Sequence, residues 1–333
     1  MSRRALRIGL IVGLPLSALF LWLAVRKVDL SEVWSTLTDA RPGLVVAAVC
    51  AMGVVYTLQA ERWRRVAAQA AVRWRRYLDM VVSGVAVNNV LPGRVGDLLR
   101  ARWLGLEARI PGGRALATVV IDRALDLVTL VAFLVVSLPF VTEEEWVDRI
   151  VVGGLAGLGL VTVVLLFARR YTRSRERERR QRRGFLRRIA RDTAEGLAEP
   201  IGASRLAAVA GLSVGAWVAW AAGAWLVARA VGIDLSLLET AFVAAAVNLG
   251  VAIPSSPGFV GTYQWLGVAS LGLFGVPGEE ALAFAILLQA VWYLPTTVVG
   301  GVLLIRRASA TRRGLRSANG VEGSIGVPGH EAG

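Results

Sequence analysis

The stretch Thr240–Gly278 reads TAFVAAAVNLGVAIPSSPGFVGTYQWLGVASLGLFGVPG, 39 residues without a charged side chain. A helix needs about 20 mostly apolar residues to cross a bilayer, so this stretch can cross twice or enter and return. Its middle is interrupted by Pro254-Ser255-Ser256-Pro257-Gly258, and proline and glycine interrupt helices. This pattern predicts a membrane protein with a re-entrant or broken helix.

Other parts of the chain are equally apolar. The composition is 55% hydrophobic and 19% charged, whereas soluble domains have about 25% charged residues. One predicted span, Ala115–Phe140, carries three charges near its start. We therefore expect an all-α polytopic integral membrane protein with about six to eight transmembrane helices. The spans without charges are Ile8–Val25, Gly43–Ala60, Ile150–Ala168, Leu206–Ala228 and Ala281–Ile305.

The net charge of +14 comes almost entirely from arginine, with Lys27 the one lysine. The arginines fall in short segments between apolar spans, as they do in cytoplasmic loops, rather than in one soluble domain that would bind nucleic acid. We expect a multi-pass protein of the cell membrane with both termini in the cytoplasm, together with Glu61–Arg76 and Arg169–Arg191. The second segment has twelve arginines and two glutamates. Two alternatives stay open for it, a helix on the anionic inner leaflet or a solvated loop.

This orientation can be tested by cysteine labelling. After replacement of Cys50, a cysteine at position 145 should react with an impermeant thiol reagent, because the acidic segment Thr142–Arg149 is expected outside. A cysteine at position 180 should be protected in sealed cells, because the arginine-rich segment is expected inside. Labelling at position 180 would contradict the orientation and the inverted arrangement of the two halves.

The predicted domain organisation is simple. Residues 1–307 form one membrane domain, with halves at about 1–168 and 192–307 joined by the basic segment 169–191. Residues 308–333 have little apolar content and are expected to be a disordered cytoplasmic tail. Cys50 and His330 are the single cysteine and histidine, so we expect no thiolate or histidine metal site and no cofactor.

An internal repeat relates the two halves. Ala86-Val87-Asn88 followed by PGRVG recurs as Ala246-Val247-Asn248 followed by PGFVG. The first copy enters from the cytoplasm and the second from outside, and opposed broken helices in two halves indicate an inverted-repeat transport fold. The alternative is two ordinary Pro-Gly loops. The residues expected to break the helices are Pro92, Gly93, Gly96, Pro254, Pro257, Gly258 and Gly261.

Charged residues gather near the first break. Arg94 and Arg100 can each hold a phosphate through a planar guanidinium group, with Asp97 one turn from Arg100. The alternative is a helix cap with arginines that only set topology. Intramembrane charges indicate function by default, and three lie in the span 115–140. Asp122 and Asp126 share a helix face, and we expect Arg123 to pair with Asp126; a purely structural ion-pair clasp remains the alternative.

The remaining candidates for substrate binding are uncharged. They can line a passage, bind sugar or headgroup hydroxyls, or satisfy the backbone of a broken helix. They are Asn88 and Asn89 in the first half and Asn248, Ser255, Ser256, Thr262, Tyr263 and Gln264 in the second.

Three motifs resemble the transmembrane region of lysylphosphatidylglycerol synthase/flippase and its stand-alone flippase-like relatives. They are Asn88–Arg100 (NNVLPGRVGDLLR), Thr118–Leu127 (TVVIDRALDL) and Pro257–Gln264 (PGFVGTYQ), and the similarity runs from about residue 8 to 305. The resemblance implies movement of a lipid, such as an aminoacylated phospholipid or polyprenyl-linked sugar, between leaflets. The family's third motif often ends in glutamate where this chain has Gln264, which weakens any proposal of a titrating carboxylate there.

The resemblance also bears on enzymatic activity. Bifunctional relatives carry a soluble aminoacyltransferase domain after the membrane part, and only about 28 residues follow the last predicted helix here. We therefore expect a lipid-translocating protein without catalytic residues, working on membrane lipids and beside a separate lipid-modifying or glycosyltransferase enzyme. Two alternatives remain, a membrane-embedded transferase acting on lipid-linked sugars and a non-catalytic scaffold docking through the basic segment.

Overall fold

The computed structural model describes residues 15, 17–91, 94–137, 152–159, 163, 185–250 and 257–322. Predictions on Pro92, Gly93, Pro254, Ser255 and Ser256, and on positions 145 and 180, lie outside these residues. The described parts contain helices and no strand, which confirms the all-α prediction. The elements are α2 (Leu30–Thr38), α3 (Pro42–Ala67), α4 (Trp74–Val90), α5 (Val95–Ala108), α6 (Gly112–Ser137), α8 (Phe185–Ala198), α9 (Ala203–Ala230), α10 (Leu237–Gly250), the short 3-10 helix η2 (Pro257–Phe259), α11 (Thr262–Gly272) and α12 (Gly278–Glu322).

Three described helices are long and apolar enough to cross a membrane. They are α3, α9 and the part of α12 that covers Gly278–Ser309. Helix α6 has the same length as α3 but carries Asp122, Arg123 and Asp126 near its middle, and α10 is a shorter apolar helix. Helices α3, α6, α9, α10 and α12 meet in the largest hydrophobic cluster, which includes Met52, Leu134, Phe242 and Leu288.

The first predicted break is a helical hairpin. Helix α4 ends at Val90, the chain turns, and α5 begins at Val95 and runs back along α4. The Asn88 side chain accepts a hydrogen bond of 2.7 Å from the Gly96 amide, so this asparagine closes the turn. Gly84 and Gly96 allow the two backbones to touch, because a Cβ built on Gly96 would lie 1.9 Å from the Gly84 carbonyl oxygen. Small residues permit such close approach between membrane helices.

The second break lies between α10 and α11. Gly258 and Gly261 both have positive φ, at 74° and 89°, which favours glycine. The Gln264 side chain accepts a 2.7 Å hydrogen bond from the Gly261 amide and donates one to Gln289 on α12. Gln289 in turn donates to the Gly258 carbonyl at 2.6 Å. Two buried glutamines therefore satisfy backbone groups that a continuous helix would have paired internally.

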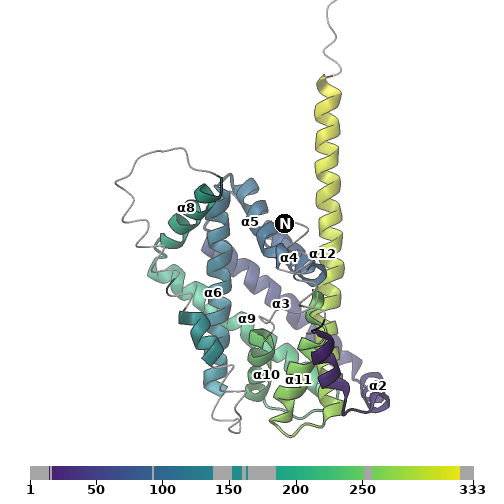
Figure 1. Ribbon diagram of the computed structural model, residues 1–333. Helices are drawn as coiled ribbons and strands as arrows, with labels where there is room; N and C mark the ends of the chain where they lie inside the picture. Colours follow the sequence, from purple (N-terminus) through teal and green to yellow (C-terminus); the bar gives the residue numbers. More distant parts are fainter. Residues whose placement is uncertain are drawn as a thin grey trace, which may run out of the picture.

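The helices that lead away from the two breaks extend toward opposite ends of the molecule (Figure 1), while the breaks themselves lie close together, because α4 contacts η2. The α4–α5 hairpin lies toward the end from which the C-terminal part of α12 projects, and α10 and α11 lie toward the other end. Helix α12 connects them, since the Tyr293 hydroxyl donates to the Asn89 carbonyl at 3.2 Å while Gln289 holds the second break. The inverted relation of the two halves remains a prediction from the sequence repeat.

Two predicted boundaries are corrected. The second predicted span ended at Ala60, where the uncharged stretch ends. Helix α3 instead continues to Ala67 and includes Arg62, Arg64 and Arg65. The segment from 308 was predicted to be disordered, but α12 continues to Glu322 and projects beyond the body (Figure 1). Residues 308–322 include three alanines and three arginines, which favour helix even without apolar burial. Residues 323–333 lie outside the described part.

Candidate functional site

A polar cavity of about 260 Å³ lies where the two breaks approach each other. Its wall takes residues from α3, α4, α5, α6, α9, α10, α11 and α12, so both halves of the chain build it. Asn88 and Asn248, the two asparagines of the internal repeat, both line it. The other polar lining residues are Gln59, Asn89, Arg94, Asp97, Arg123 and Asp126, and the aromatic ones are Tyr56, Trp217, Trp220, Phe259, Tyr263 and Trp292.

An ion-pair network forms one side of this cavity, and its centre is Arg62 on α3. The Arg62 side chain is fully buried and donates to Asp122 at 2.9 Å and to Asp126 at 2.8 Å. It also donates to the Ser213 hydroxyl on α9 at 3.2 Å. One arginine thus bonds to both carboxylates on the same face of α6 and ties three helices together.

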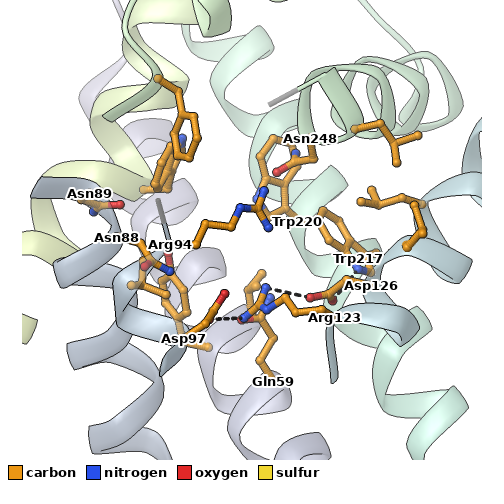
Figure 2. Close-up of a pocket in the computed structure, with 18 of the residues that line it drawn as sticks. Gln59, Asn88, Asn89, Arg94, Asp97, Arg123, Asp126, Trp217, Trp220 and Asn248 are labelled. Carbon is orange, nitrogen blue, oxygen red and sulfur yellow. Dashed lines mark hydrogen bonds and ion pairs between the residues drawn. The ribbon is translucent and has the colours of Figure 1, made fainter. Parts of the chain in front are cut away.

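The predicted pairing of Arg123 with Asp126 is confirmed, at 3.0 Å. Arg123 also lies 3.5 Å from Asp97, so it bridges α6 and the first turn of α5 (Figure 2). Asp126 accepts one more hydrogen bond, from the indole nitrogen of Trp217 at 3.2 Å. Arginines therefore offset the repulsion expected between the two α6 aspartates.

Arg100 does not reach the cavity. Its side chain is 1% exposed, pairs with Asp122 at 3.0 Å, and lies with its guanidinium 4.3 Å from the centre of the Trp63 ring. Such a contact stabilises a buried cation. Asp97 is 3.5 Å away and completes its surroundings. The residue that was predicted to grip a phosphate is instead part of the scaffold that holds α5 against α6.

Arg94 has the opposite environment. It stands at the turn of the first hairpin, directly before α5, with φ 52°. Figure 2 shows this side chain reaching into the middle of the cavity between Asn248 and Arg123. No carboxylate among the described residues lies within 4.0 Å of its guanidinium group. Within the part of the chain that the structure describes, Arg94 is the cavity arginine without a carboxylate partner and is available for a ligand.

The other predicted residues divide in the same way. Asn89 lines the cavity but donates to Thr297 on α12 at 2.9 Å. Tyr263 lines the cavity, whereas Thr262 is fully buried away from it and Gln264 supports the second break. The structure therefore brings together Asn88, Asn89, Arg94, Asp97, Arg123, Asp126, Asn248 and Tyr263, and it places Arg100, Asp122, Thr262 and Gln264 behind the wall.

Several residues of the cavity wall and of the ion-pair network behind it were missed from the sequence. Arg62 was assigned to a cytoplasmic loop, yet Met52, Val55, Gln59, Arg62 and Val66 follow a helical spacing on one face of α3. That continuation was the signal that could have revealed it. Tyr56, Trp217 and Trp220 sit in apolar spans, where sequence alone does not separate lipid-facing aromatic residues from cavity-facing ones.

The fold and site define a class of helical membrane protein, in which two broken helices from the two halves of the chain meet at a polar cavity. The chain belongs to the family described as the lysylphosphatidylglycerol synthase TM region, which matches residues 8–300. The resemblance noted in the sequence is thereby confirmed.

Similar proteins are found in archaea. A protein of Haloferax volcanii named glycosyltransferase AglD is 29% identical over 89% of this chain and 54% of its own length. A UPF0104 membrane protein of Methanothermobacter thermautotrophicus is 24% identical over 81% of this chain and 87% of its own length. One from Methanocaldococcus jannaschii is 23% identical over 46% of this chain and 47% of its own length. The chain thus spans about half the length of the first and third of these relatives.

Proposed function

We propose that this protein binds the phosphate-bearing headgroup of a lipid or lipid-linked precursor in the central cavity and moves it between the two leaflets. The observation that carries the proposal is Arg94, an arginine without a carboxylate partner among the described residues, in a cavity built by both breaks. A guanidinium group held at such a turn can donate two parallel hydrogen bonds to a phosphate. Membership of the family supports a role in lipid handling.

The geometry also supports movement rather than simple storage. The cavity lies between two breaks whose flanking helices extend toward opposite ends of the molecule (Figure 1), as in transport folds where two halves open alternately around a fixed site. The cytoplasmic orientation of the termini and the contact of residues 169–191 with the anionic inner leaflet remain parts of this proposal. A separate enzyme would synthesise or consume the lipid.

The proposal is tested by replacing Arg94 with glutamine. Hydrogen bonds to charged groups contribute about 1.5–3 kcal/mol, so translocation should fall by roughly 10- to 100-fold. Arg94→Lys should recover only part of the rate, because lysine keeps the charge but loses the planar fork. The measurement is the flip rate of a fluorescent phosphatidylglycerol or polyprenyl phosphate in proteoliposomes.

The matched control is Arg102→Gln, which removes an exposed arginine of α5 that does not line the cavity. It should translocate lipid at the parental rate. Parental activity in Arg94→Gln, with normal insertion, would remove Arg94 from the mechanism and the proposal with it.

A second candidate function is transfer of a sugar from a lipid carrier within the membrane. The name of the Haloferax relative favours it, since that protein is called a glycosyltransferase. A transferase would release sugar from a radiolabelled lipid-linked sugar when an acceptor is added, whereas a translocator would move the intact lipid. Turnover of the sugar–phosphate bond by the purified protein would favour this second candidate.

A further inference from the structure

The charges around the cavity do not balance. Among the described residues, the ion-pair network holds three arginines and three aspartates, and Arg94 in the cavity adds a fourth arginine, so one positive charge is left over. Every aspartate in the network has an arginine within 3.5 Å, and the uncompensated arginine is the one that points into the cavity. These residues are Arg62, Arg94, Arg100, Arg123, Asp97, Asp122 and Asp126.

This charge balance determines whether the headgroup of the ligand should be anionic or cationic. Asp97 and Asp126, the two carboxylates on the cavity wall, are already bonded to Arg123, and Asp126 also to Arg62. A cationic headgroup would have to displace one of these arginines while lying beside Arg94. In a site of low dielectric, such like-charge contacts are strongly unfavourable. An anionic headgroup meets the free guanidinium without breaking any existing pair.

The rest of the wall is suited to hydroxyl groups and ring faces. In the described residues, the Asn88 Oδ1 atom and the Asn248 Nδ2 group are used by backbone partners, at 2.7 Å and 2.8 Å, which leaves one amide donor and one amide acceptor for a ligand. Gln59 supplies a third amide from α3. Trp217, Trp220 and other aromatic side chains supply apolar faces that a sugar ring can pack against. Ligand sites characteristically combine such apolar walls with a few fixed polar groups.

From these observations, and resting on the proposed function, we infer that the site accepts a lipid carrying a small sugar phosphate and rejects lipids with cationic aminoacyl headgroups. The phosphate would lie against Arg94, and the sugar between the tryptophans and the amides. The cavity of about 260 Å³ lies just below the range of about 300–1,000 Å³ for small-molecule sites, so it takes one small headgroup rather than a long oligosaccharide.

The inference is tested by binding, separately from transport. The full chain in detergent is titrated with three probes: a short-chain polyprenyl phosphomannose, phosphatidylglycerol and lysylphosphatidylglycerol. We expect the phosphomannose lipid to bind at least tenfold more tightly than lysylphosphatidylglycerol, with phosphatidylglycerol between them. Trp220→Ala should weaken the phosphomannose lipid several-fold and leave phosphatidylglycerol unchanged, whereas Trp34→Ala, at an exposed position on α2, should change neither.

The outcomes separate this inference from the proposed function. Equal or tighter binding of lysylphosphatidylglycerol would overturn the charge argument, and equal binding of phosphatidylglycerol and the phosphomannose lipid would overturn the sugar argument, even if proteoliposomes still flip lipid. The expected order of affinities without any flipping would support the inference about the ligand while contradicting translocation.

Discussion

Replacing Arg62 with methionine should prevent most of the protein from reaching its stable fold. The change removes the partner that Asp122 and Asp126 share in the interior, and breaking a buried ion pair costs about 3–5 kcal/mol. Such a loss is a large share of the total stability of a typical domain. The measurement is the thermal unfolding and the yield of monodisperse protein after purification in detergent.

Two further variants serve as comparisons for Arg62→Met. Arg64→Met removes an arginine two positions away whose side chain is 41% exposed and pairs with Glu61, so its cost should stay near the 0–1 kcal/mol of surface pairs. The double variant Arg62→Met/Asp122→Asn removes one charge of each sign, and Arg100 keeps Asp97 at 3.5 Å. It should be more stable than the single variant. If Arg62→Met behaves like Arg64→Met, the network does not hold the helices together.

Gly96→Ala is expected to disrupt the α4–α5 hairpin. The added methyl would lie 1.9 Å from the Gly84 carbonyl oxygen and 2.7 Å from the Asn88 side-chain oxygen, so the backbones must separate. Overpacking in a rigid contact costs about 1–3 kcal/mol, and loss of the Asn88–Gly96 hydrogen bond adds to it. Because Arg94 stands at this turn, lipid translocation should fall together with thermal stability.

Gly53→Ala is the matched control, since nothing lies within 4 Å of a Cβ at that position in α3. Alanine there should leave stability unchanged or raise it slightly, because glycine is the weaker helix former. Both variants are assayed by thermal unfolding and by lipid flipping in proteoliposomes. A Gly96→Ala protein as stable and as active as Gly53→Ala would show that the close contact of α4 with α5 is dispensable.

The ion-pair network holds in place the helices that line the cavity. Arg62, Arg100 and Arg123 engage all three aspartates and fix α3, α5 and α6 relative to one another. A site that must hold a phosphate needs its free cation in a fixed place, and rigid supporting contacts provide that placement. The scaffold arginines therefore fix the helices, whereas the cavity arginine Arg94 is placed to bind the ligand.

Much of this organisation could be predicted from local sequence. Long apolar stretches give the spans α3, α9 and α12, because a helix that satisfies its own backbone is the stable way to cross lipid. The breaks after Val90 and Gly250 follow from proline and glycine, which act on their immediate neighbours. The Arg123–Asp126 pair follows from a spacing of three along one helix.

The assignment of charges to scaffold or cavity was decided only by the tertiary structure. Arg62, Arg94 and Arg100 are chemically identical, and sequence placed the first in a loop and the other two at the site. Packing of α3 against α6 buries Arg62 between two aspartates. Arg100 is held behind the cavity wall by its contacts with Trp63 and Asp122. Arg94, at the turn of the hairpin, lines the cavity and has no carboxylate partner among the described residues. These outcomes depend on contacts between residues 22 to 64 positions apart, and no local pattern encodes which partner a buried charge will meet.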